Sequence, residues 1–235
     1  MESYTLYLVN RSATVQNFWC FLAPPQELAN DPGVFASSSV CLAVPPNDPG
    51  VNSLVIPVQY VVGAGASNEA VGLGAVINSS VTQYADVSQV WQAAYADAPP
   101  NMGPSLYVTQ DPTPPNTIAI AANAFDQAQN ENNAWFGNMS FGIQTEAGFM
   151  GMSWSPYPNQ VRTITPNLSF FVATGDFDSN MLTDWTQLQY GAQLSVSQNF
   201  SLGACTVTCT DTGQWNVTPG APMQGQAVRG GGVQF

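Results

Sequence analysis

The chain consists largely of short segments in which apolar and polar residues alternate, and glycine or proline occupies nearly every gap between them. Alternation with a period of two is typical of a strand that buries one face, and glycine and proline mark the turns between strands. The segments span residues 4–9, 18–22, 40–44, 54–62, 73–77, 105–108, 117–121, 139–143, 149–154, 161–164, 168–173, 192–196, 204–209 and 214–217. This pattern predicts an all-β fold, an antiparallel β-sandwich of jelly-roll type.

One segment follows a helical period instead. Residues 86–89 match a capping box, in which Asp86 would start the helix and Gln89 would reach back to it. The apolar residues around it keep the spacing of one helix face: Val87, Val90, Trp91, Ala94 and Tyr95. The segment therefore predicts one short helix near 86–96 that crosses between strands and buries its apolar stripe.

A repeated pattern suggests two similar halves, residues 1–103 and 104–218. Pro46-Asn47, Ile56-Pro57 and the apolar run at 60–62 are matched by Pro158-Asn159, Thr165-Pro166 and the run at 170–172. Two hairpins related by an old duplication would produce this echo, and so would two matched hairpins that arose by convergence. Both origins stay open, and we treat residues 1–218 as one β-sandwich domain.

Residues 219–235 form a glycine-rich tail with no core-forming period. The tail contains Arg229, one of three cationic residues, and ends in Phe235. We expect these two residues to dock on an acidic or apolar groove of the same or a neighbouring subunit. The alternative is a frayed terminus, which is common for glycine-rich ends.

The chain has no lysine and no histidine, so most catalytic chemistry lacks its usual side chains. The chain has three arginines and 15 carboxylates, which give a formal net charge of -12. Nucleic acids and anionic membranes are excluded as partners because both require clustered cations. We also expect repulsion between carboxylates to raise their pKa values where they cluster.

The cysteines and the chain ends bear on the compartment. Cys205 and Cys209 lie about 13 Å apart in an extended strand, too far to form a disulfide with each other. We expect all four cysteines, which include Cys20 and Cys41, to be buried free thiols. Because no signal peptide or membrane-spanning segment is evident, we expect a cytoplasmic protein or one secreted without a leader. In such a protein, we interpret the glycosylation sequons of the chain as by-products of an amide-rich composition. There are six, at Asn10, Asn78, Asn138, Asn167, Asn199 and Asn216.

Two acidic motifs have a structural and a functional reading. Asp211-Thr212-Gly213 matches the aspartic protease triplet but stands alone, so a hairpin turn is the better interpretation. Asp176, Asp178, Asn180 and Asp184 have the spacing of calcium ligands, although Met181 and Gln187 replace the glycine and glutamate of such loops. This segment is either a weak calcium site or a solvated loop, and no other cofactor is expected.

Two tryptophans are candidates for an exposed binding platform. Trp135 follows a polar segment at 130–134, and Trp185 follows the acidic segment at 176–184. Most other aromatic residues should belong to the core, because aromatic side chains dominate the interiors of sandwiches.

A set of glycine, proline, asparagine and aromatic positions is similar to a group of small β-rich proteins of fungi and bacteria. The positions are residues 4–6, 9–12, 137–143, 148, 158–159, 165–166, 171–175 and 215–217. The resemblance implies a β-rich fold. No activity is assigned to that group, so the resemblance implies no catalytic residues.

These observations predict a non-enzymatic protein that acts by binding or by self-association, as a structural or interaction protein. Lysine, the usual guard against pairing between sheet edges, is missing from the chain. The alternative is a lectin-like protein that binds neutral glycans at Trp135 and Trp185. A membrane-active, pore-forming protein is the second alternative.

Overall fold

The computed structural model describes residues 2–77, 79–97 and 103–222, and strands account for 48% of it against 7% for helices. The β-rich prediction is therefore confirmed. The strands form four mostly antiparallel sheets, and none of the four closes on itself. The jelly-roll arrangement and the division into two halves stay predictions.

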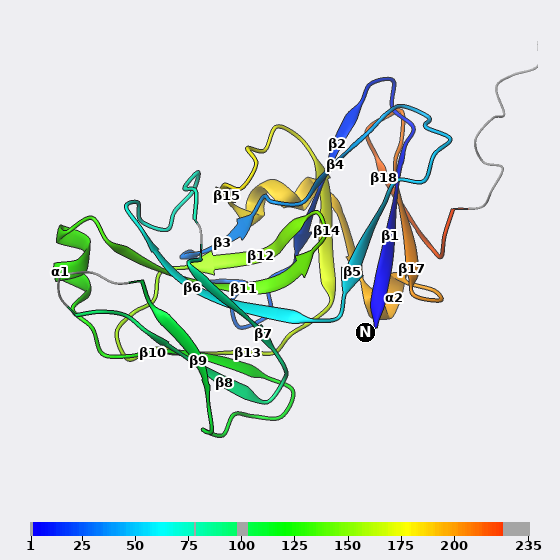
Figure 1. The fold of residues 1–235 in the computed structure, drawn as a ribbon. Helices are drawn as coiled ribbons and strands as arrows, with labels where there is room; N and C mark the ends of the chain where they lie inside the picture. Colours follow the sequence, from blue (N-terminus) through cyan, green and yellow to red (C-terminus); the bar gives the residue numbers. More distant parts are fainter. Residues whose placement is uncertain (1, 78, 98–102, 223–235) are drawn as a thin grey trace, which may run out of the picture.

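The first two sheets have four strands each (Figure 1). The first has the order β18 (Trp215–Pro219), β17 (Ala204–Cys209), β1 (Ser3–Asn10) and β5 (Ser53–Pro57). The second has the order β16 (Ala192–Ser195), β14 (Ser169–Thr174), β2 (Gln16–Leu22) and β4 (Cys41–Val44). In the first sheet β1 pairs with β17 in parallel, and its other neighbour, β5, is antiparallel.

The third sheet has six strands and lies between the fourth sheet and the first two in Figure 1. Its order is β15 (Leu182–Thr183), β3 (Val34–Ser37), β12 (Gly148–Trp154), β11 (Phe136–Thr145), β6 (Tyr60–Ser67) and β7 (Val81–Ala85). The fourth sheet has the order β13 (Val161–Ile164), β10 (Ile118–Ala122), β8 (Gln89–Ala94) and β9 (Ser105–Thr109). Short helices complete the fold: α1 (Gln127–Asn132), the 3-10 helix η1 (Trp185–Tyr190) and α2 (Val196–Asn199).

One buried cluster joins the four sheets. It contains Leu6 of β1, Phe18 of β2, Phe141 of β11 and Ile120 of β10, all fully buried. Because inward-facing apolar residues of every sheet meet in this cluster, it accounts for the alternating pattern of the sequence.

The helix expected near 86–96 is wrong, because residues 89–94 form strand β8. The side chain of Gln89 does accept a hydrogen bond from the N–H of Asp86 at 2.9 Å, as a capping box requires. The chain nevertheless turns at Ser88, whose φ is 67°, and enters the sheet. β8 lies between β10 and β9, so pairing on both sides outweighs the helical spacing of its apolar residues.

The prediction that each copy of the repeated pattern forms a hairpin is also wrong. β5 pairs with β1 and β6 pairs with β11, so the chain changes sheet after Pro57. In the second copy β13 pairs with β10 and β14 pairs with β2, and the change of sheet spans Pro166. Proline cannot donate a ladder hydrogen bond, which favours the end of pairing at both points. The hairpin expected around Asp211 does form, because β17 pairs with β18 across that turn.

The strands are almost free of charge. Arg162 in β13 is the one charged residue within any strand of the described chain. The 15 carboxylates of the protein all lie in turns, loops or α1, outside the strands. Apart from Arg162, the strands are therefore neutral, although the molecule as a whole is strongly acidic.

Candidate functional site

The calcium motif is spread over two places in the structure. Asp176 and Asp178 are exposed beside a cavity of about 210 Å³, and Asn180 forms a turn with φ at 62°. Asp184 instead caps η1, because its carboxylate accepts the N–H of Thr186 at 2.9 Å. Within the ranges that the structure describes, no group of three or more cysteine, aspartate or glutamate side chains gathers where it could hold a metal ion.

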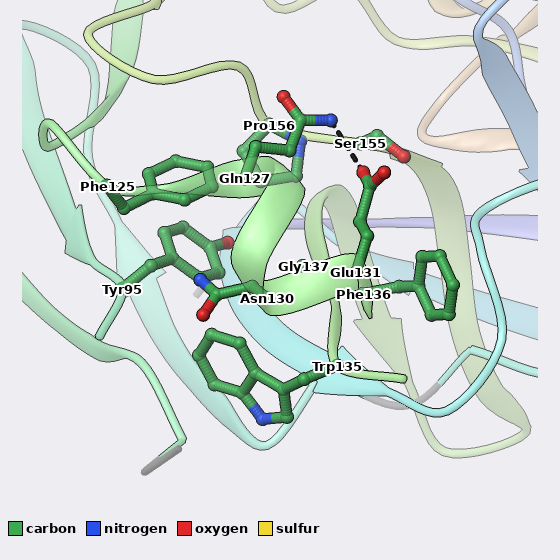
Figure 2. A pocket seen from close by; sticks show the side chains of 10 residues that line it. All are labelled: Tyr95, Phe125, Gln127, Asn130, Glu131, Trp135, Phe136, Gly137, Ser155 and Pro156. Atoms are coloured by element: carbon green, nitrogen blue, oxygen red, sulfur yellow. Dashed lines mark hydrogen bonds between the residues drawn. The ribbon is translucent and has the colours of Figure 1, made fainter. Parts of the chain in front are cut away.

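The first candidate platform, Trp135, lies beside a cavity at the end of α1 (Figure 2). Its indole meets the ring of Tyr95 edge-on, with ring centres 6.3 Å apart and an interplanar angle of 74°. Tyr95 also packs against Phe125, with ring centres 5.1 Å apart. Three aromatic rings therefore surround one side of the cavity, and Trp135 itself is half-buried.

This cavity is small because its walls approach closely. A Cβ atom on Gly137 would lie 3.1 Å from Pro156 and 3.1 Å from the ring of Tyr95, so glycine permits the contact. The hydroxyl of Tyr95 donates to the carbonyl oxygen of Asn138 at 2.6 Å, and burial raises the pKa of this tyrosine. The open volume of about 10 Å³ has room for about one water molecule and none for a sugar ring.

Asn130 contributes a buried polar group to the same cavity. Its side chain is 2% exposed, and its amide nitrogen donates to the carbonyl oxygen of Ala96 at 2.8 Å. Its Oδ1 has no hydrogen-bond partner in the described chain. A buried acceptor beside a space of this size is a typical place for an internal water molecule.

The second candidate platform, Trp185, lines a wider groove of about 350 Å³. Residues 29–35 form one wall and residues 184–189 form the other. β15 pairs with β3 through Leu182 and Thr183, and this pairing brings together two segments that are distant in the sequence. The N–H of the Trp185 indole donates to the carbonyl oxygen of Val34 at 2.9 Å, which fixes the orientation of the ring.

Asp31 supplies a fixed carboxylate to this groove. Its Oδ2 accepts a hydrogen bond from Arg162 at 2.7 Å, and its Oδ1 accepts the N–H of Gly33 at 2.8 Å. Burial works to raise the pKa of Asp31, but the Gly33 N–H and the Arg162 guanidinium hold it below its usual range. Asp31 is therefore ionised and has a single orientation.

The four thiols are free, as the sequence predicts, and Cys20, Cys205 and Cys209 are buried. Cys41 is only half-buried, in contrast to the prediction. Burial raises the pKa of Cys20 to about 12 and that of Cys205 to about 11, so neither forms a thiolate at neutral pH. Two of the sequon asparagines, Asn10 and Asn138, are also buried, at 1% and 0% exposure, and cannot carry a glycan in the folded protein.

Sequence reasoning named Trp185 and Asp184 but missed Asn30, Asp31 and Gln189, which share the groove. No motif marks these residues, because their proximity depends on the pairing of β3 with β15. The tail residues Arg229 and Phe235 lie outside the described residues.

Comparison with known proteins gives no relative: no family model, no curated protein and no solved structure matches this chain. Among the described residues, no helix is long and apolar enough to cross a membrane.

Proposed function

We propose that the protein is a non-enzymatic interaction protein that associates with further copies of itself through the edges of its open sheets. The observation that carries this proposal is the neutrality of the outer strands. Eight strands are the outermost strands of their sheets in the described chain, and Arg162 is the one charged residue among them. The outer side of β15 is already covered, because Leu182 forms backbone hydrogen bonds with Gly74 and Ala75. The outer strands are β4, β5, β7, β9, β13, β15, β16 and β18.

An outer strand presents unpaired N–H and C=O groups, and natural proteins usually block such strands with lysine or other charges. The charge of Arg162 does not act in this way, because its side chain is only 12% exposed and pairs with Asp31. The carboxylates lie in the connections, so two copies can bring strands together while their acidic loops stay in solvent.

The strongest candidate edge is β9, next to β7 (Figure 1). Tyr107 and Val108 of β9 are each about half exposed, and Tyr84 of β7 is 67% exposed. Val87, on the turn after β7, is exposed as well. Apolar side chains gathered along two uncharged outer strands favour a neutral partner, and a second copy offers an identical surface for symmetric pairing.

Light scattering after size-exclusion chromatography, from micromolar to submillimolar concentrations, tests the proposal. We expect an assembly whose mass rises with concentration and returns to that of the monomer in Tyr107→Lys and Val108→Lys. Val15→Lys is the matched control, because Val15 is equally exposed but lies in a loop between strands. A monomer at every concentration would refute the proposal, and so would equal effects of the three lysine substitutions.

A further inference from the structure

We propose that the groove between residues 29–35 and 184–189 binds a neutral carbohydrate against the face of Trp185. The groove contains no residue of β7 or β9, the strands of the strongest candidate edge, so the two proposals can be tested separately. The groove combines an open shape, an aromatic ring in a fixed orientation and polar groups around that ring.

The aromatic surface is preorganised. Trp185 packs against the buried core on one side and lines the groove on the other. Because its N–H already donates to Val34, the ring offers an apolar face and no polar edge. Phe35 adds a second half-buried aromatic side chain to the same lining. A sugar ring presents C–H groups on one face, and such a face is complementary to an aromatic ring held in one orientation.

Two side-chain amides in the groove can form hydrogen bonds with hydroxyl groups of a ligand. Asn30 and Gln189 line the groove with exposed side chains, and neither amide forms a hydrogen bond within the described chain. Each amide offers two N–H donors and one acceptor oxygen. Vicinal hydroxyls, which donate and accept together, match this pair of groups, and an apolar ligand would leave both amides unused.

The carboxylates select against anions. Asp31 and Asp184 both line the groove, and each keeps lone pairs beyond the hydrogen bonds it already accepts. These oxygens can accept from ligand hydroxyls. A sulfated or sialylated sugar would meet two negative charges, whereas Arg162 offsets the charge of Asp31 and so weakens the attraction for a cation.

The two tryptophans that the sequence analysis identified lie beside spaces of very different volume. The groove of about 350 Å³ lies at the lower end of the range for small-molecule sites, which suits a mono- or disaccharide unit. The cavity beside Trp135 holds about one water molecule. The binding role therefore belongs to Trp185, and Trp135 has a structural role.

Calorimetric titration of the full chain with cellobiose, N,N′-diacetylchitobiose and lactose tests the proposal, after a screen on an array of neutral oligosaccharides. We expect a dissociation constant on the order of 1 mM or tighter for at least one neutral sugar. Asn30→Ala and Gln189→Ala should each weaken binding by about tenfold, since each removes hydrogen bonds to the ligand. Trp185→Phe keeps an aromatic ring and should weaken binding less than Trp185→Ala.

Two control substitutions outside the groove test whether a loss of affinity is specific to the groove residues. Gln198→Ala removes an exposed glutamine in α2, outside the groove, and should leave affinity unchanged. Trp135→Phe should also leave it unchanged. The proposal is overturned if no neutral sugar binds, if Asn30→Ala and Gln189→Ala bind like the unaltered protein, or if glucosamine or a sulfated sugar binds more tightly than its neutral counterpart.

Discussion

Arg162 and Asp31 form an ion pair of 2.7 Å that ties the outer strand β13 to the loop before β3. The guanidinium carbon of Arg162 also lies 5.3 Å from the ring centre of Trp154, a fully buried residue of β12. One side chain therefore links the fourth sheet to the third. The side chain of Asp31 is 32% exposed, so solvent screens part of the interaction.

Removal of this pair should destabilise the fold measurably. We expect Arg162→Met to lower the free energy of unfolding by about 1–3 kcal/mol, because it leaves a partly buried carboxylate without its cation. A double-mutant cycle with Asp31→Asn, measured by urea denaturation, should give a coupling energy of about 1 kcal/mol. Asp211→Asn, in the exposed turn between β17 and β18, is the control and should have little effect. Additive effects of Arg162→Met and Asp31→Asn would contradict the prediction.

Acid should destabilise the protein, because three of its carboxyl groups have pKa values below their usual range. Burial works to raise the pKa values of Glu27 and Asp31, but hydrogen bonds hold both pKa values below their usual range. Thr165 donates to Glu27, and Gly33 and Arg162 donate to Asp31. The Gly50 N–H and the Asn52 side chain lower the pKa of Asp48. The pKa shifts of these three groups, which accept hydrogen bonds in loops, are therefore opposite in sign to the rise expected where carboxylates cluster.

A carboxylate with a lowered native pKa stabilises the fold fully above its unfolded pKa, and this contribution is lost as pH falls through the native value. The melting temperature should accordingly be level between neutral pH and about pH 5 and should fall below about pH 4. Asp31→Asn should make that fall shallower. A melting temperature that rises between pH 5 and pH 3 would show that charge repulsion dominates instead.

The cross-strand pair Gly142 and Gly151 has no space for a side chain. A Cβ atom on Gly142 would lie 2.5 Å from the carbonyl oxygen of Met150 and 2.6 Å from the Cα atom of Gly151, and backbone cannot move aside cheaply. We expect Gly142→Ala to lower the free energy of unfolding by about 1–3 kcal/mol. Gly72→Ala is the matched control because nothing lies within 4 Å of its Cβ position. Equal thermal melting curves for the two variants would contradict the steric argument.

Local chemistry alone determined much of the secondary structure. A period of two in apolar residues needs only one buried face, so strands with alternating burial such as β1 and β5 follow from their own residues. The sequence did not predict β3, β7 and β15 of the third sheet. The turn at residues 211–213 is likewise local: Gly213 has a φ of 74°, which glycine adopts without strain, and the strands on either side pair directly. The neutrality of the strands can also be read from the sequence once their positions are known.

Only the tertiary structure decided which segments pair. Val90 and Trp91 fit a helix face and a buried strand equally well, and the neighbouring strands β9 and β10 selected the strand. The same holds for the groove, since the Trp185 N–H and the Val34 carbonyl oxygen are separated by 151 residues in the chain. Periodicity reports which face of a segment is buried but not what covers it, because the partner is chosen by packing between distant parts of the chain.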